Sequence, residues 1–151
     1  MNKIFNTTFE SSLRILLLLS VSEDEQMTLD RIADYDFITI YSKYFGISNM
    51  ALHGENEFGL SEFAARRGMM QSTMKSLVLD GLVSVKRRQN GFQYSISVVG
   101  KTVAGKMKSE YANNYKMLAL KTVEHFKGQS EQKIMKTISN TSIEFLRRKR
   151  Y

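Results

Sequence analysis

The sequence contains no cysteine, no proline and no tryptophan, and the first of these absences excludes several kinds of site. Without cysteine, disulfide bonds, thiolate metal sites and cysteine nucleophiles are excluded. Histidine is also scarce, since His53 and His125 are its two occurrences and lie far apart in the chain. A zinc site would therefore need other ligands from distant segments. Because proline interrupts helices, its absence fits a mainly helical chain of 151 residues, a length that usually forms one hydrophobic core.

Long apolar runs are missing as well. The longest extends from Leu13 to Leu19 and contains Arg14, whereas a membrane-spanning helix needs about 20 apolar residues. No small-residue cleavage site follows Leu19, as a secretory signal would require. We therefore expect a cytoplasmic protein.

Charge is divided unevenly along the chain. Residues 1–60 hold four Lys and Arg against nine Asp and Glu, a net charge of −5. Residues 61–151 hold eighteen against six, a net charge of +12. Such an asymmetry indicates either contact of the second half with nucleic acid or an acidic partner, or lysines that solvate long helices.

Two helices are predicted in the acidic half. The sequence Thr7–Glu10 has the spacing of a capping box, so a helix should follow to about Ser22. Its run Ile15–Leu19 leaves almost no polar side and places this helix in the middle of the core. A second helix should begin near Thr28, with apolar residues at three- and four-residue steps up to a stop at Gly46. His53 falls in the loop that follows and is interpreted as solvated.

A third helix is predicted from Ser61, as N-cap, to Asp80, with Gly81 as terminator. The expected apolar side includes the stem of Arg67, with its guanidinium paired to an acidic side chain, and the expected outward side includes Arg66 and Thr73. The apolar side itself consists of Phe63, Met70, Met74, Leu77 and Val78.

A β-hairpin is predicted at about residues 82–98. Asn90-Gly91 is a strong signal for a type I′ turn, and a turn there pairs Val85 with Ile96, Val83 with Val98 and Arg87 with Tyr94. The alternating apolar residues then share one face of the hairpin.

Two amphipathic helices should complete the chain, one over residues 100–127 and one from Ser130 into the basic run Arg147–Arg150. Their apolar stripes exceed what a small core can cover, so we predict partial exposure and partner binding. The alternative is that the last helix folds back over the stripe. The candidate partner-binding residues are Val103, Met107, Tyr111, Tyr115, Leu118, Phe126, Ile134, Ile138 and Phe145.

The order helix, helix, helix, hairpin, helix is that of a winged-helix domain. The predicted fold class is therefore mainly α with a β-hairpin: a winged-helix domain over 1–100, then a C-terminal helical extension over 101–151 for partner binding. In DNA-binding relatives the third helix enters the major groove and the wing touches phosphate. Here the third helix lacks a base-reading cluster, which favours non-specific contact. The candidate DNA-binding residues are Arg66, Lys86, Arg87, Arg88, Arg147, Arg148, Lys149 and Arg150.

Catalytic patterns are not found. His53 and His125 lie on different predicted elements, so no serine–histidine–acid set has spacing support. The carboxylates Asp34 and Asp36 are interpreted as part of an acidic surface. We therefore expect neither an enzyme nor a bound cofactor, metal or small-molecule substrate.

Three motifs in order give a family resemblance. They are Phe5–Arg14 before the leucine run, the aspartate-rich segment Leu29–Phe37, and the arginine pair of Glu62–Arg67 leading to Asp80–Val83. Over about residues 4–110 they resemble the middle component of ABC-three-component bacterial defence systems, which include the small accessory subunit of Lamassu-type antiphage systems.

This resemblance implies a non-catalytic winged-helix subunit that bridges an SMC/Rad50-like ATPase and a nuclease effector. In such a complex the partners supply ATP hydrolysis and DNA cutting. The alternative is a homodimeric winged-helix DNA-binding transcription regulator that dimerises through its C-terminal helices.

Overall fold

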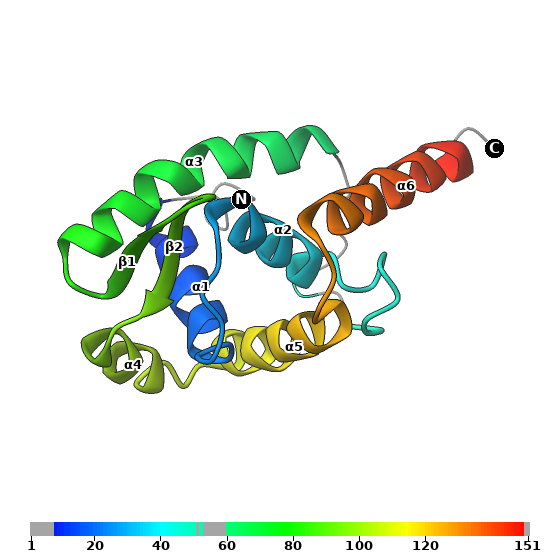
Figure 1. Ribbon diagram of the computed structural model, residues 1–151. Helices are drawn as coiled ribbons and strands as arrows, with labels where there is room; N and C mark the ends of the chain where they lie inside the picture. The colour runs from blue at the N-terminus through cyan, green and yellow to red at the C-terminus, as the bar shows by residue number, and fades with distance from the viewer. Residues whose placement is uncertain (1–7, 51, 53–59, 150–151) are drawn as a thin grey trace.

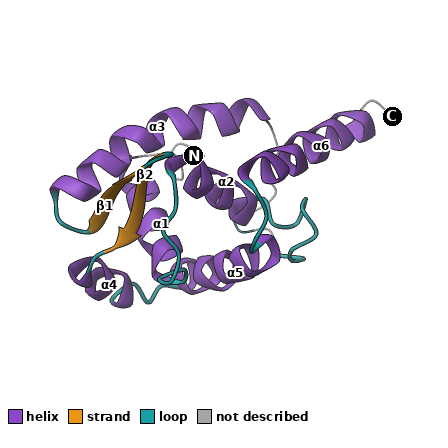
Figure 2. Ribbon diagram, in the orientation of Figure 1, coloured by secondary structure: helices purple, strands orange, loops and turns teal. Residues whose placement is uncertain are grey.

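The computed structural model describes residues 8–50, 52 and 60–149, with the backbone alone for 60–62 and 149. Over these residues the chain forms six helices and one hairpin (Figures 1 and 2). The expected mainly helical fold with a β-hairpin is confirmed. In chain order the elements are α1 (Thr8–Ser20), α2 (Leu29–Ile40), α3 (Leu60–Leu79), β1 (Val83–Arg88), β2 (Gly91–Ile96), α4 (Val98–Gly105), α5 (Glu110–Phe126) and α6 (Glu131–Lys149).

Helices α1 and α2 form the centre of the molecule. The run Ile15–Leu19 of α1 is buried on all sides, as its uniform apolar character predicts. On α2, every residue from Ile32 to Ile40 is buried, because α1, α3, α5 and α6 all pack against this helix. The burial includes Asp34 and Asp36, so the interpretation of these two carboxylates as surface groups is wrong.

Helix α2 begins at the predicted position, near Thr28. Thr28 is the N-cap of α2, and its hydroxyl accepts a hydrogen bond from the Arg31 amide at 3.2 Å. This helix ends at Ile40, however, and turns lead on to Gly46, whose φ of 71° is left-handed. The Thr7 cap, His53 and the Ser61 side chain lie outside the described residues.

Helix α3 has the predicted length, but its two arginines are placed the other way round. Arg66 and Thr73 are buried, whereas Arg67 is about half exposed and forms an ion pair with Asp30. Arg66 lies three residues after Phe63 and four before Met70, which is the spacing of one helix face. The predicted outward orientation of Arg66 and Thr73 is therefore wrong, whereas the predicted pairing of the Arg67 guanidinium with an acidic side chain is confirmed.

The hairpin register differs from the prediction by two residues. Val83 pairs with Ile96, Val85 with Tyr94, and Arg88 with Gly91, so the chain reverses at Gln89 and Asn90. A type I′ turn would need positive φ at both central residues, but here Gly91 is the residue with positive φ, at 111°. A shift of two preserves the alternation of faces. Val98 cannot pair with Val83, because it is already the first residue of α4.

The single helix predicted over residues 100–127 is two helices, α4 and α5, separated at Lys106–Ser109. Ser109 caps α5 by accepting from the Ala112 amide at 3.1 Å. At the start of α4, Gly100 is buried so closely against β1 that a Cβ atom there would lie 2.1 Å from the Leu82 carbonyl oxygen. Ser97 adds hydrogen bonds to the Gly81 and Leu82 carbonyls.

The predicted exposed stripe on the C-terminal helices is buried instead. Helix α5 packs against α1 and α2, and α6 packs against α2. These contacts leave five of the candidate partner residues completely buried, namely Tyr115, Leu118, Phe126, Ile134 and Ile138. The other four, Val103, Met107, Tyr111 and Phe145, are partly buried against the core. The prediction that the stripe stands clear of the core is therefore wrong, because α1 and α2 cover it.

Helix α6 extends beyond the rest of the molecule at its C-terminal end (Figure 1). Its 19 residues correspond to a length of about 28 Å. Among the described residues, no helix is long and apolar enough to cross a membrane.

Candidate functional site

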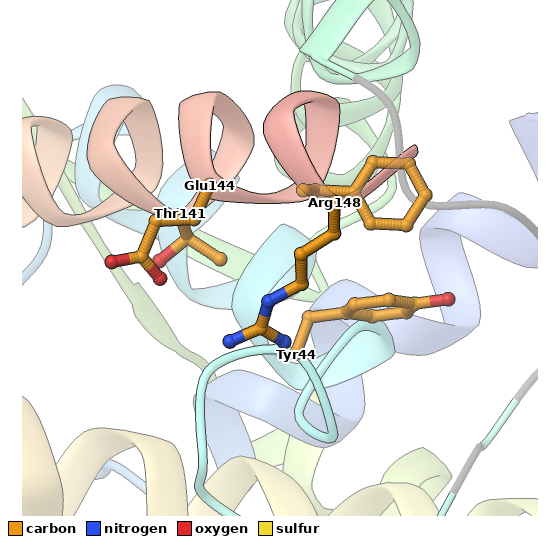
Figure 3. Close-up of a pocket in the computed structure, with 5 residues that line it drawn as sticks. Tyr44, Thr141, Glu144 and Arg148 are labelled. Atoms are coloured by element: carbon orange, nitrogen blue, oxygen red, sulfur yellow. The ribbon is translucent and has the colours of Figure 1, made fainter. Parts of the chain in front are cut away.

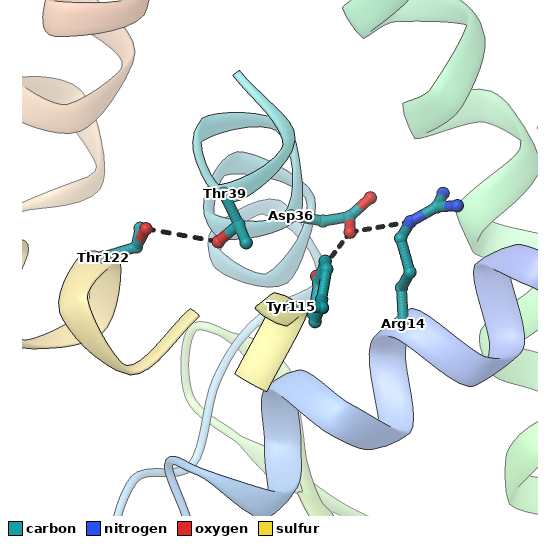
Figure 4. Close-up of polar contacts among 5 residues, drawn as sticks. All are labelled: Arg14, Asp36, Thr39, Tyr115 and Thr122. Atoms are coloured by element: carbon teal, nitrogen blue, oxygen red, sulfur yellow. Dashed lines mark hydrogen bonds and ion pairs between the residues drawn. The ribbon is translucent and has the colours of Figure 1, made fainter. Parts of the chain in front are cut away.

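A charged network lies at the junction of α1, α2 and α5 (Figure 4). The Arg14 Nε atom donates to Asp36 Oδ1 at 3.0 Å, and the Tyr115 hydroxyl donates to the same oxygen at 2.6 Å. One turn further along α2, Thr39 bonds to Thr122 at 3.2 Å. Buried charges are stable only when they are paired and hydrogen-bonded, so this network orients the three helices.

The electrostatics of the network support a structural role. Burial alone would raise the pKa of Asp36, but the Arg14 and Arg66 guanidinium groups and the Tyr115 hydroxyl hold it below its usual value. Burial, together with the Asp36 carboxylate, raises the pKa of Tyr115 well above its usual value. Asp36 is thus a permanent anion and Tyr115 a permanent donor. Arg14, Asp36 and Tyr115 are all enclosed in the core, where a substrate has no access.

The predicted DNA-binding residues are dispersed. Lys86, Arg87 and Arg88 are exposed near the tip of the hairpin, where Arg88 donates to the Gln26 side chain at 3.2 Å. Arg147 and Arg148 are exposed near the far end of α6, about 24 Å along that helix from Glu131. Arg66 is buried and so does not belong to either group. The Lys149 side chain and Arg150 lie outside the described residues.

Helix α6 carries a second apolar face that the sequence analysis missed. Ile143 and Leu146 are largely exposed on the half that projects from the body, and Arg147 and Arg148 follow directly. We call Ile143, Leu146 and Arg147 the distal α6 surface. The signal for it was present, because Ile143 and Leu146 are apolar residues three apart that lie off the stripe of Ile134 and Ile138.

A hollow of about 340 Å³ lies on the other side of α6 from Ile143 and Leu146 (Figure 3). It lies between α6 and the turn after α2, where the Tyr44 and Phe145 rings meet edge to face with centroids 5.4 Å apart. Arg148 reaches from α6 toward Tyr44 across this hollow. Aromatic rings and arginine are residue types enriched at protein interfaces.

A second exposed apolar surface lies at the base of the hairpin. Leu79 ends α3, while Val98 and Val99 begin α4, and these three side chains are exposed. The Ser97 amide, which donates to the Leu82 carbonyl at 3.1 Å, holds the two helix ends beside each other. We call Leu79, Val98 and Val99 the hairpin-base surface. Figure 1 places it at the opposite end of the molecule from the distal α6 surface.

No group of three or more histidine or acidic side chains within metal-binding reach occurs in the part of the chain that the structure describes. His125 is exposed on α5 and contacts the Phe126 ring edge to face at 4.7 Å between centroids. The structure therefore presents two exposed apolar surfaces and one buried charged network.

Comparison with known proteins gives one match. The family model described as "ABC-three component (ABC-3C) system Middle Component 2" matches residues 4–148. No curated protein and no solved structure matches the chain. The match extends over nearly the whole sequence and covers the described helices and strands up to the last residue of α6. The chain therefore belongs to the middle component 2 family, whose members are components of ABC-three-component defence systems.

Proposed function

We propose that this chain is a non-catalytic accessory subunit that bridges an SMC/Rad50-like ATPase and a nuclease effector in an antiphage defence complex. The observation that carries the proposal is the pair of apolar surfaces at opposite ends of the molecule. A contiguous apolar surface that stays exposed in a monomer normally marks an interface. Two such surfaces, separated by the folded core, let two partners bind without competing for space.

The helical order with a hairpin after α3 supports a winged-helix arrangement as the scaffold of this bridge. In this proposal the third helix does not read DNA, because its arginine at position 66 is directed into the core. The same burial weakens the alternative of a homodimeric transcription regulator. A regulator would form a stable dimer alone and protect a defined operator, whereas a bridging subunit does neither.

Assembly of the three proteins tests the distal α6 surface. The chain would be co-expressed with the ATPase and the effector encoded beside it, and recovered through a tag on each partner in turn. Leu146→Asp should release one partner and leave the other bound. Asn140→Asp is the matched control, because it places the same charge at an exposed polar position of α6. Retention of both partners by the Leu146→Asp variant would contradict the proposal.

The hairpin-base surface is tested in the same way. Val99→Asp introduces a carboxylate into the first turn of α4, where the helix dipole favours negative charge, so the fold should be unaffected. We expect this variant to lose the partner that Leu146→Asp retains. Thr102→Asp, at an exposed position on the same helix, is the control. Loss of one and the same partner with both variants would mean that the two surfaces form one interface.

We also propose that DNA contact is non-specific and comes from Lys86, Arg87, Arg88 and the basic end of α6. Phosphate contacts of this kind release counterions, so log affinity should fall linearly with log salt concentration. Replacing the three hairpin cations by glutamine should reduce the slope by roughly one unit per lost phosphate contact. Lys121→Gln on α5 is the control. Tight binding to one short operator would favour the regulator instead.

A further inference from the structure

A hollow of about 400 Å³ separates the first turn of α6 from α2 and α3. Its walls combine apolar and charged side chains from all three helices. They include Asp30, Asp34, Phe63, Arg67, Glu131 and Met135. Phe63 and Met135 supply the apolar wall, while three carboxylates and one guanidinium supply the charge.

Two of the three carboxylates already have partners. Asp30 forms an ion pair with Arg67, and Glu131 accepts a hydrogen bond from the Thr28 hydroxyl. Asp34 differs from both. Its side chain is 1% exposed, and its Oδ2 atom has no hydrogen-bond partner. A buried polar atom without a partner destabilises the fold, so its presence in a native structure needs an explanation.

The surroundings of Asp34 favour an incoming cation. Burial raises the pKa of Asp34 to about 8, and the nearby Glu131 and Asp30 carboxylates raise it further than Arg31 and Arg67 lower it. Arg31 is engaged elsewhere, because its guanidinium bonds to the Tyr35 hydroxyl at 3.3 Å. A metal ion is not indicated, since the described residues contain no group of three acidic or histidine side chains suited to one.

We propose that this hollow receives one lysine or arginine side chain of a partner protein, whose charged end pairs with Asp34. The aliphatic stem of such a side chain would lie against Phe63 and Met135, and its N–H groups would donate to the Asp34 carboxylate. Below about pH 8 this pairing requires Asp34 to release the proton that it carries in the free chain. A neutral donor could form a hydrogen bond to that oxygen, but it would not offset the negative charge of the Asp30 and Glu131 carboxylates beside it. That the occupant belongs to a protein partner rests on the proposed function, whereas the preference of the hollow for a cation does not.

The preference for a cation is tested on the chain alone with n-butylammonium chloride, which reproduces a lysine side chain. Nuclear magnetic resonance would follow the Asp34 carboxyl carbon and the Met135 methyl group during titration. We expect saturable shifts at both, at least tenfold weaker binding of neutral 1-butanol, and loss of the ammonium response in Asp34→Asn. Equal binding of butanol, no saturable shift with either probe, or an unchanged response in Asp34→Asn would overturn the proposal.

The partner is tested by assembly. Asp34→Asn should weaken capture by one of the two partner proteins at least tenfold, whereas Glu124→Gln, which removes an exposed carboxylate from α5, should not. If the unmodified chain captures neither partner, the proposed function fails, and the butylammonium titration still decides whether the hollow selects cations. If the unmodified chain assembles and Asp34→Asn assembles equally well, the partner side chain does not enter this hollow and the inference fails alone.

Discussion

Asp34 and Asp36 lie two residues apart on α2, are equally buried, and have opposite electrostatic environments. Asp36 faces α1 and α5, where Arg14 and Tyr115 bond to one of its oxygens and hold its pKa low. Asp34 faces α3 and α6, where one of its oxygens has no partner and its pKa rises to about 8. Residues two apart lie about 200° apart around a helix. The buried carboxylate on one side of α2 is thus paired with a cation and a hydrogen-bond donor, whereas the one on the other side has an oxygen without a partner.

The largest effect on stability should come from removing Arg14, the cation that pairs with Asp36. Arg14→Met keeps much of the apolar stem but leaves Asp36 without its main cation. Removing one member of a buried pair typically costs roughly 3–5 kcal/mol, so the free energy of unfolding should fall by about that amount. Urea denaturation measures it. A loss below about 1 kcal/mol would show that Arg66 alone satisfies Asp36.

The second largest effect should be the pH dependence of stability that Asp34 confers. The folded chain keeps this proton up to about pH 8, whereas the unfolded chain releases it near pH 3.8. The folded state therefore binds more protons between these values, and its stability falls as the pH rises through this window. At about 1.4 kcal/mol per unit, the loss from pH 5 to pH 8 should be roughly 2–4 kcal/mol.

Asp34→Asn should remove that pH dependence while changing stability little at pH 5, because asparagine resembles the protonated acid. Urea denaturation at a series of pH values checks both statements. Asp36 has the opposite sign, because its lowered pKa contributes stability that is lost as the pH falls through its folded value. An equally steep alkaline loss in Asp34→Asn would contradict the assignment.

A smaller effect is expected from Tyr115→Phe, which deletes one donor to Asp36 and keeps the ring. A hydrogen bond to a charged group contributes roughly 1.5–3 kcal/mol, and the loss should be at the lower end because Arg14 still pairs with Asp36. Thermal or urea unfolding measures the change. Combined with Arg14→Met, the two losses should not be additive, since both act on the same oxygen.

The smallest effect on stability should come from the exposed ion pair between Arg67 and Asp30, which lies near Asp34. Arg67 and Asp30 are each about half exposed, and such pairs contribute roughly 0–1 kcal/mol. Arg67→Gln should therefore change the free energy of unfolding by less than about 1 kcal/mol, and high salt should abolish the difference. A loss similar to that of Arg14→Met would show that Arg67 neutralises Asp34 as well.

Local sequence patterns predicted where helices begin and end better than they predicted which side chains the neighbouring helices bury. The apolar run of α1, the Thr28 cap and the glycine after α3 each report on neighbours in the chain, and all three agree with the structure. The burial of Asp34 and Asp36 depends instead on which helices pack around α2. Arg14 was the available clue, because an arginine within a buried leucine run needs a carboxylate partner.

The errors at the candidate site have the same origin. Tyr115 and Leu118 were expected at an interface because their helix seemed too long for the core, but the break at Lys106–Ser109 lets α5 turn and pack against α1 and α2. The hairpin register was wrong because Asn90-Gly91 fixes where a turn occurs but not which two residues are central. Val98 was predicted on the apolar face of the hairpin but is exposed, because it is the first residue of α4, and the exposed Ile143 and Leu146 lie off the core-facing stripe of α6.

The close approach of Gly100 to the Leu82 carbonyl has a consequence for the thermodynamics of assembly. Since α4 cannot move toward β1, and Ser97 ties both to the end of α3, the hairpin-base surface is already in one conformation before a partner arrives. Association there should sacrifice little chain entropy and proceed close to rigid-body docking.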